Sequence, residues 1–189
     1  LSTLLGSITV AEQPEPRGTG DAVRRAVGSL PDGCDEVVIS YGDTPLITAE
    51  LLRAVGEQRR SAASPLALVV FRAEDPTGYG RVVLDDSERA TAIVEERDAD
   101  EETRELNLVN AGVYAVDRPW LEAAIATLKP SPSGEIYLTD LVAIAAAEGR
   151  PAAIVVGDGA ELEGVNDRRQ FADAAAALRE RINERSEEH

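Results

Sequence analysis

The residues with the clearest chemical potential lie where a carboxylate closely follows an apolar stretch. Val37–Ile39 are three β-branched apolar residues, and Tyr41, Gly42 and Asp43 come shortly after them. This order predicts a buried strand and the loop that leaves its carboxyl end. Ligands bind at that end of the strands in open α/β sheets. Asp43 therefore lies where a metal ion or a hydroxyl-rich substrate would be bound, and Gly42 lets the backbone come close to it. The alternative is an aspartate that caps the following turn or helix.

A second polar residue interrupts an apolar stretch. Leu106–Val116 is expected to form a strand, and it carries Asn110 and Gly112 in its middle. A buried asparagine is costly unless its amide is hydrogen bonded, and a glycine inside a strand often marks a place where another group approaches the backbone. Either neighbouring backbone groups satisfy Asn110 or its side chain faces a ligand.

Two glycines flank Thr19 just before a helix that is expected over Ala22–Leu30. A loop of this kind can present backbone N–H groups to an anion. Gly18-Thr19-Gly20 resembles the first half of a dinucleotide-binding fingerprint, but Val23 stands where the third glycine should be. An ordinary helix entry explains the segment equally well.

Strand and helix patterns alternate along the chain and would position these residues. Strands are expected at Ile8–Ala11, Val37–Ile39, Leu66–Phe71, Val82–Leu84, Ala90–Glu95, Leu106–Val116 and Ala152–Val156. Helices are expected at Ala22–Leu30, from a Thr48 cap to about Arg60, at Arg118–Leu128 behind an Asp117 cap, at Leu141–Glu148 and at the carboxyl end. Because one hairpin interrupts the alternation, the pattern predicts an α/β fold, a three-layer sandwich around a mostly parallel, Rossmann-like sheet with an inserted β-hairpin.

The composition narrows the functions that the chain can have. The 189 residues include 35 acidic and 19 basic side chains, which gives a net charge of −16. Such a charge repels phosphate backbones and anionic membranes, so no nucleic acid and no membrane is expected as a partner. Cys34 is the only cysteine and His189 the only histidine, which excludes an internal disulfide, a cysteine-based zinc site and histidine-dependent catalysis. This composition fits a cytoplasmic location.

Seven motifs occur in the order and spacing of a known enzyme family. They are Gln13 with Gly18-Thr19-Gly20, Tyr41-Gly42-Asp43-Thr44-Pro45-Leu46, Gly78-Tyr79-Gly80-Arg81, Val94-Glu95, Asn110-Ala111-Gly112-Val113-Tyr114, Glu135-Ile136-Tyr137-Leu138-Thr139-Asp140 and Gly164-Val165-Asn166-Asp167-Arg168. Together they resemble the uridylyltransferase domain of the bacterial bifunctional N-acetylglucosamine-1-phosphate uridyltransferase/glucosamine-1-phosphate acetyltransferase family. The resemblance runs from about Gln13 through the last helix, and it implies an α/β fold of the nucleotide-diphospho-sugar transferase type.

The resemblance implies a role for each matching residue. Asp43 and Asn166 would be the catalytic metal ligands, because oxygen atoms suit Mg²⁺, which also keeps water and phosphate in its coordination shell. Gln13, Gly18 and Thr19 would face the nucleotide, with Gln13 and Gly18 at the uracil. Thr19 would also line the sugar pocket. The residues that would bind the sugar phosphate are Tyr41, Gly42, Gly80, Glu95, Asn110, Tyr137 and Thr139.

The reaction that the resemblance implies is nucleotidyl transfer. The phosphate of N-acetylglucosamine 1-phosphate attacks the α-phosphorus of UTP, pyrophosphate leaves, and UDP-N-acetylglucosamine forms for cell-wall precursor synthesis. The attacking phosphate is already anionic, so alignment and charge neutralisation by Mg²⁺ suffice and no protein nucleophile is needed. Two alternatives stay open. One is another sugar-1-phosphate nucleotidylyltransferase with a different sugar or base, and the other is a non-catalytic sugar-nucleotide-binding module.

The chain departs from the family pattern at both ends. The family opens with a strand and a glycine-rich loop that cradles the triphosphate, and no segment before Gln13 matches them. We therefore expect residues 1–166 to form a partial nucleotidyltransferase domain. Residues 167–189 are expected to form the C-terminal helix of the same domain, leading toward an acetyltransferase domain that this sequence does not contain. Through that domain the full-length protein is expected to form a homotrimer, and the fragment alone is expected to be poorly active or inactive.

Overall fold

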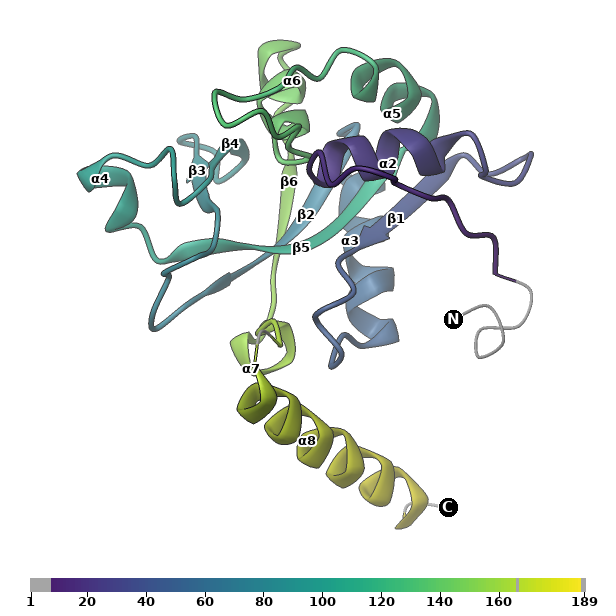
Figure 1. Ribbon diagram of the computed structural model, residues 1–189, viewed down its shortest axis with the longest axis vertical. Coiled ribbons are helices and arrows are strands. Elements are labelled where there is room, and N and C mark those ends of the chain that lie inside the picture. The colour runs from purple at the N-terminus through teal and green to yellow at the C-terminus, as the bar shows by residue number, and fades with distance from the viewer. Residues whose placement is uncertain (1–7, 166, 188–189) are drawn as a thin grey trace.

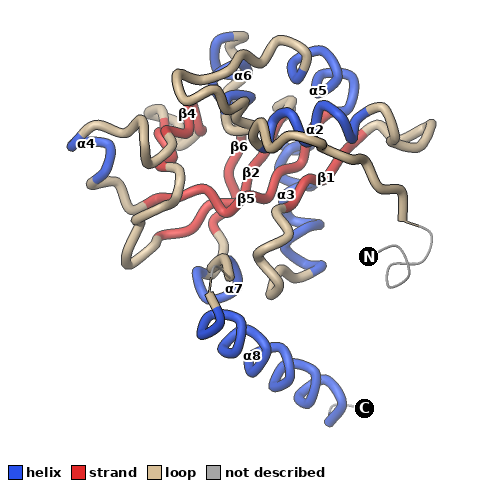
Figure 2. The backbone as a smooth tube through the Cα atoms, in the orientation of Figure 1, coloured by secondary structure: helices blue, strands red, loops and turns tan. Residues whose placement is uncertain are grey.

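Six strands form one sheet with helices on both faces (Figure 1 and Figure 2). The computed structural model describes residues 8–165 and 167–187. The strands are β1 (Glu36–Ser40), β2 (Leu66–Arg72), β3 (Arg81–Leu84), β4 (Ala90–Val94), β5 (Leu108–Asp117) and β6 (Ala153–Val156). The helices are α2 (Thr19–Val27), α3 (Ala49–Ser61), α4 (Glu101–Arg104), α5 (Arg118–Ile125), α6 (Asp140–Ala147), α7 (Gly159–Leu162) and α8 (Arg168–Glu187). Within the described ranges, no helix has the length and apolar character needed to cross a membrane.

The strand pairing corrects one part of the sequence prediction. The sheet has the order β4-β3-β5-β2-β6, and β1 pairs with the same edge of β5 as β3. β5 is antiparallel to β1, β2 and β3, whereas β2 and β6 pair in parallel. The α/β class and the β3–β4 hairpin are confirmed, but a mostly parallel sheet is wrong as a description of neighbouring strands. Parallel neighbours need a crossover, usually through a helix that packs on the sheet, and β5 follows the hairpin after only the short, exposed α4.

Alternate residues of the central strands pack on opposite faces of the sheet. Leu66 and Leu68 of β2 belong to the core that α5 and α6 cover. Ala67 and Val69 of the same strand belong to the core shared with Val55 of α3. This period of two is the geometry of a strand that is buried on both faces. The two cores therefore confirm the three-layer arrangement that the sequence predicts.

The edge of β5 that faces β1 and β3 positions the candidate site. β1 leaves this edge where the Tyr41 N–H donates to the Gly112 carbonyl at 3.1 Å. β3 joins the edge where the Asn110 N–H donates to the Gly80 carbonyl at 3.0 Å. The end of β1 and the start of β3 thus lie beside nearby residues of β5, Gly112 and Asn110. Residues of the loop after Tyr41 and of the loop before Gly80 line one cavity together with Asn110 and Ala111 of β5.

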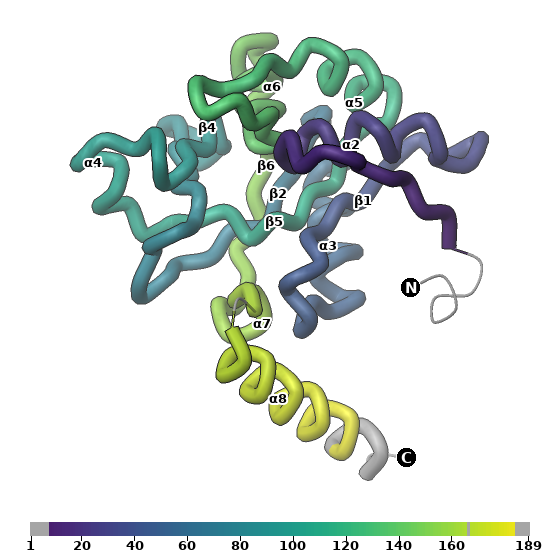
Figure 3. Tube along the Cα trace, in the orientation of Figure 1, coloured from purple at the N-terminus to yellow at the C-terminus, as the bar shows by residue number. Residues whose placement is uncertain are grey.

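The helix caps follow the sequence prediction, but one expected strand is absent. The side chains of Thr48 and Asp117 accept hydrogen bonds from the backbone N–H groups at the starts of α3 and α5. The segment Ile8–Ala11 forms no strand, so that prediction is wrong. Ile8 and Val10 are 55% and 64% exposed, because no described strand lies beside them. At the other end of the chain, α8 leads away from the sheet (Figure 3).

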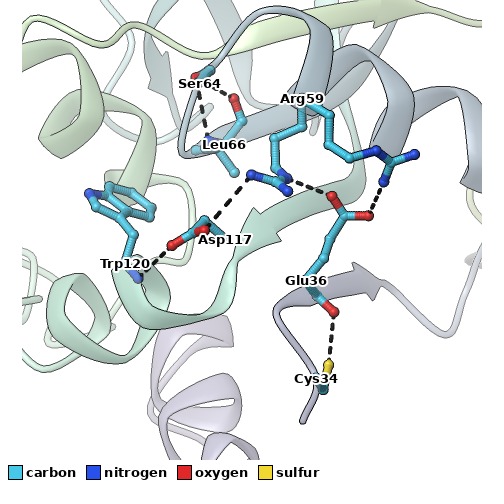
Figure 4. A network of polar contacts seen from close by, with 8 residues as sticks. Cys34, Glu36, Arg59, Ser64, Leu66, Asp117 and Trp120 are labelled. Carbon is cyan, nitrogen blue, oxygen red and sulfur yellow. Dashed lines mark hydrogen bonds and ion pairs between the residues drawn. The ribbon is translucent and has the colours of Figure 1, made fainter.

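An ion-pair network fixes the end of β1 that lies farthest from Asp43. Glu36 accepts hydrogen bonds from Arg59 at 2.7 Å and Arg60 at 2.6 Å, both from α3. Arg59 also lies 4.0 Å from Asp117 at the end of β5 (Figure 4). The side chains of Glu36 and Arg59 are 23% and 13% exposed, so water screens this pair less than a surface pair. The network therefore ties β1, β5 and α3 together.

Replacing Glu36 by glutamine is expected to lower the free energy of unfolding by about 2 kcal/mol, because hydrogen bonds to a charged partner are lost and two arginines keep their charge. Urea unfolding measures the change. Glu50→Gln is the matched control, because Glu50 pairs with Arg53 on the solvent-exposed side of the same helix. The control is expected to change the stability little. Equal effects of the two substitutions would contradict a structural role for the network.

Candidate active site

A cavity of about 350 Å³ opens over β5, and residues of the loops after β1 and before β3 help to line it. It is lined by Tyr41, Asp43, Thr44, Thr77, Gly78, Tyr79, Gly80, Glu95, Asn110, Ala111, Leu162 and Gly164. Tyr41, Asp43, Gly80, Glu95 and Asn110 are five residues that the resemblance assigns to substrate or metal. They come from four segments of the sequence, and the fold brings them to one opening.

Asp43 lies in the exposed wall of this cavity. Its backbone carbonyl accepts a hydrogen bond from the Val165 N–H at 2.7 Å, which joins the loop after β1 to the segment before α8. The N-cap of the following helix is Thr48, so the interpretation of Asp43 as the cap of that helix is wrong. Asn166, the other expected metal ligand, follows Val165 directly but lies outside the described residues.

Asn110 is both satisfied by its neighbours and open to the cavity. Its Oδ1 accepts a hydrogen bond from the Gly112 N–H at 3.1 Å, and its Nδ2 donates to the Tyr114 hydroxyl at 2.6 Å. Gly112 has a φ of +71°, and a Cβ there would meet the ring of Tyr41. The ring of Tyr41 thus occupies the space beside Gly112, and burial raises the pKa of its phenol. Neighbouring backbone thus satisfies part of the Asn110 amide, as one interpretation of the sequence expected, and a ligand at its remaining positions stays a prediction.

Glu95 carries a second carboxylate at the cavity. Thr139 donates a hydrogen bond to its Oε1 at 2.7 Å. Burial raises the pKa of Glu95, and the nearby carboxylate of Asp140 adds to the rise. Gly80 lies beside Glu95, and its lack of a side chain makes room for Ile93, which a Cβ there would approach to 2.7 Å. Thr139 therefore does not line the cavity itself but holds a residue that does.

The loop before β3 supplies lining residues to which the sequence analysis gave no role. The Tyr79 hydroxyl accepts a hydrogen bond from the Gly164 N–H at 3.4 Å, and its ring packs edge-on against Phe71 at 5.3 Å. Arg81 is 2% exposed, lies 2.7 Å from Glu96 and donates to the Tyr79 carbonyl. A tyrosine between two glycines was the signal that could have singled out this loop. Buried Arg81, paired with the partly exposed Glu96, thus holds the backbone of Tyr79 in place.

Glu95 and Glu96 are adjacent in the sequence, and their pKa values shift in opposite directions. These shifts give a test of the structure. Burial raises the pKa of Glu95 above its ordinary value of 4.5. The protein is therefore at its full stability with respect to Glu95 below pH 4.5, where this side chain is protonated. Its stability declines as the pH rises from 4.5 to the raised pKa. Arg81 lowers the pKa of Glu96, so its contribution is present above 4.5 and is lost as the pH falls through the lowered pKa.

Urea unfolding of Glu95→Gln and Glu96→Gln between pH 4 and pH 8 is therefore expected to give opposite trends. Relative to the unsubstituted chain, Glu95→Gln gains stability as the pH rises, because a carboxylate that is buried when ionised is removed. Glu96→Gln loses relative stability over the same range, because the partner of Arg81 is removed. Parallel trends for the two variants would contradict the assigned surroundings.

The expected nucleotide-binding residues Gln13, Gly18 and Thr19 are not among the residues that line the cavity. The Gln13 Nε2 donates to the Gly18 carbonyl at 3.1 Å and to Asp21 Oδ2 at 2.9 Å. Gly18 has a φ of +101°, and a Cβ there would lie 2.5 Å from the Ile136 carbonyl oxygen, so its lack of a side chain already serves packing. The Gln13 hydrogen bond, and then Arg25, lower the pKa of Asp21.

The remaining expected residues lie at the border of the cavity. Thr19 Oγ1 accepts a hydrogen bond from the Leu138 N–H at 3.1 Å, which joins the start of α2 to the segment before α6. The Tyr137 hydroxyl lies 3.2 Å from Ser133 Oγ, and Tyr137 lines a neighbouring groove together with Gly78 and Glu95. Gly42 precedes Asp43 in exposed backbone, with open space where a side chain would be.

Comparison with known proteins gives a consistent result. A family model described as Nucleotidyl transferase matches residues 3–180. "Bifunctional protein GlmU" of Rhodococcus opacus is 44% identical over 191 residues, covering 97% of this chain and 38% of the relative. The proteins of the same name from Sorangium cellulosum and Corynebacterium efficiens are 42% and 39% identical, with 94% and 97% of this chain and 38% of each relative covered. The chain thus spans well under half the length of these relatives. With the family model matching nearly its whole length, the chain belongs to the nucleotidyl transferase family.

Proposed function

We propose that this chain forms the sugar-binding part of a uridylyltransferase that makes UDP-N-acetylglucosamine and pyrophosphate from UTP and N-acetylglucosamine 1-phosphate in the cytoplasm. The observation that carries the proposal is the cavity over β5. Tyr41, Asp43, Gly80, Glu95 and Asn110 all line it. Carboxylate and amide groups suit sugar hydroxyls and an acetamido group, and the glycine lets the backbone come close to a ring.

The surroundings of Gln13 support recognition of a uracil base. Both partners of its Nε2 are hydrogen-bond acceptors, the Gly18 carbonyl and the Asp21 carboxylate, so the orientation of the amide is fixed. The group that Gln13 can offer to a base is then Oε1, an acceptor. Uracil carries an N–H between its two carbonyl groups that can donate to such an atom, whereas unprotonated cytosine has no hydrogen at that position.

The residues present fit a magnesium ion. Of the two expected ligands, the structure describes Asp43, whose carboxylate lies in the cavity wall. The Asp43 backbone carbonyl accepts a hydrogen bond from Val165, the residue before Asn166. Among the described residues no group of three or more histidine, cysteine, aspartate or glutamate side chains could enclose a metal. One or two protein ligands are usual for Mg²⁺, which keeps water and substrate phosphates in its coordination shell. Bound there, Mg²⁺ would neutralise phosphate charge.

The charge of the cavity supports low activity of this chain alone. The described lining includes the carboxylates of Asp43 and Glu95 but no lysine or arginine. A triphosphate needs compensating positive charge, which Mg²⁺ and the family's glycine-rich opening segment would supply. We accordingly propose residues 1–166 as part of the catalytic domain and residues 167–189 as a helix leading toward an acetyltransferase domain. The homotrimer expected for the full-length protein belongs to the same proposal.

In the proposed reaction an oxygen of the sugar phosphate forms a bond to the α-phosphorus of UTP, and the bond from that phosphorus to the pyrophosphate oxygen breaks. The chain's own residues hold the two substrates in line: Gln13 holds the base, and Glu95 and Asn110 hold the sugar. Alignment of this kind lowers the barrier without a protein nucleophile.

The test is pyrophosphate release by a protein in which this chain follows the glycine-rich opening segment of the family. Release that requires UTP, N-acetylglucosamine 1-phosphate and Mg²⁺ is expected. Release with only another sugar phosphate or another nucleotide would replace the proposed substrates by those of a related nucleotidylyltransferase. Binding of UDP-N-acetylglucosamine without any turnover, even in the full-length protein, would instead indicate a non-catalytic binding module.

A further inference from the structure

β5 carries a bulge at the cavity. Leu68 of β2 pairs with Tyr114, and Val70 pairs with Asn110. β2 advances two residues between these pairs while β5 advances four, so β5 contains extra residues around Gly112. In a regular strand, the Cα atoms of residues four apart are separated by roughly 13 Å, so their side chains do not normally meet. Because of the bulge, the Asn110 amide and the Tyr114 hydroxyl instead meet at 2.6 Å.

The bulge also fixes which way the Asn110 amide points. The Gly112 N–H can only donate, so the Asn110 oxygen must face it, at 3.1 Å. The Asn110 nitrogen must then face Tyr114. An asparagine amide can donate two hydrogen bonds and accept two. One N–H and one acceptor position of Asn110 therefore remain for a ligand in the cavity.

Tyr114 lies behind the cavity and does not line it. It is 1% exposed, and its ring centroid lies 6.4 Å from that of Tyr41, which does line the cavity. Burial raises the pKa of Tyr114 well above its ordinary value, so its hydroxyl keeps its proton and remains a neutral partner for the amide. A hydroxyl held by packing on all sides is well suited to hold another side chain.

We infer that Tyr114 is a positioning residue that sets the sugar specificity of the cavity through Asn110. By holding the Asn110 amide, it presents one N–H donor and one carbonyl acceptor side by side. A planar acetamido group, with its own carbonyl and N–H, matches that pair. The inference rests on the proposed function for the identity of the ligand, but the positioning of Asn110 can be tested without any ligand.

The first experiment follows the side-chain amide signals of Asn110 by NMR in this chain, assigned through their loss in Asn110→Ser. In the unsubstituted chain these protons are expected to exchange slowly with solvent. Tyr114→Phe is expected to shift the signals and accelerate their exchange about fivefold, the equivalent of one hydrogen bond. Tyr79→Phe, which removes another hydroxyl from the cavity region, is the matched control and is expected to leave the Asn110 signals unchanged.

Unchanged Asn110 signals in a folded Tyr114→Phe variant would overturn the positioning role. If that variant fails to fold, the unsubstituted chain decides, because exchange as fast as that of an exposed asparagine would equally overturn the role. Slow exchange in the unsubstituted chain would support it.

The second experiment titrates the same proteins with UDP-N-acetylglucosamine and with UDP-glucose. The unsubstituted chain is expected to prefer the acetamido sugar, and Tyr114→Phe is expected to reduce that preference about fivefold while binding of UDP-glucose changes little. An unchanged preference in the variant would overturn the specificity role. Binding of neither sugar nucleotide by the unsubstituted chain would count against the proposed function and the sugar role together. The NMR result would then still show whether Tyr114 positions Asn110.

Discussion

Replacing Gly112 by alanine is expected to lower the free energy of unfolding by about 3 kcal/mol, the sum of two costs. A residue with a Cβ is strained at the φ of +71° that Gly112 adopts. The added Cβ would also lie 2.7 Å from Cγ of Tyr41, so the ring would have to move. Because Tyr41 lines the cavity, this substitution is expected to disturb the site as well as the fold. Urea unfolding and the near-ultraviolet circular dichroism of the tyrosines measure the two effects.

The chain contains a matched control that separates the two costs. Gly149 has a φ of +74°, almost the same as Gly112, but a Cβ there would have nothing within 4 Å. Gly149→Ala is therefore expected to cost only the backbone strain, about 1 kcal/mol. The difference between the two variants isolates the contact with Tyr41. Equal losses of stability would show that the ring of Tyr41 does not pack on Gly112.

Features that depend on local signals could be predicted from the sequence. The caps at Thr48 and Asp117 and the β3–β4 hairpin follow from residues that are close together in the chain. Ile8 and Val10 show the limit of the same reasoning. Their alternation with polar residues is typical of a strand, but a strand also needs a neighbour, and pairing is decided by distant segments.

The direction of β5 could not be predicted for the same reason. Its composition suits a strand buried on both faces, which is usual in parallel sheets. Yet its neighbours β1, β2 and β3 all run antiparallel to it. Hydrophobic pattern reports burial and does not report direction, so only the connection through the short α4 could have indicated the reversal.

The candidate site was partly predictable, because the resemblance indicated which residues from distant segments belong to one site. Asp43 and Asn110 were conspicuous as polar residues beside or within apolar strands, and both lie in the cavity wall. Tyr114 looked like an ordinary core residue, because only the bulge in β5 brings its hydroxyl to Asn110. Nearly all of β5 is buried on both faces, so a bulge changes which residues meet without leaving a trace in its apolar pattern.

Asp43→Ala, made in a protein that also contains the family's glycine-rich opening segment, is expected to lower kcat on the order of a thousandfold, because several kcal/mol of charge stabilisation by Mg²⁺ would be lost. Asp43 is exposed, and the described contact to Val165 is made by its backbone, so the fold should tolerate the change.

The measurement is pyrophosphate release over a range of Mg²⁺ concentrations. Loss of a ligand should raise the concentration needed for half-maximal rate as well as lower the maximum. Asp86→Ala, in the exposed turn between β3 and β4, removes a negative charge away from the described cavity lining and controls for net charge. An Asp43→Ala variant with an unchanged Mg²⁺ dependence would refute the ligand role. The cavity over β5 would then be a sugar site whose metal is held elsewhere.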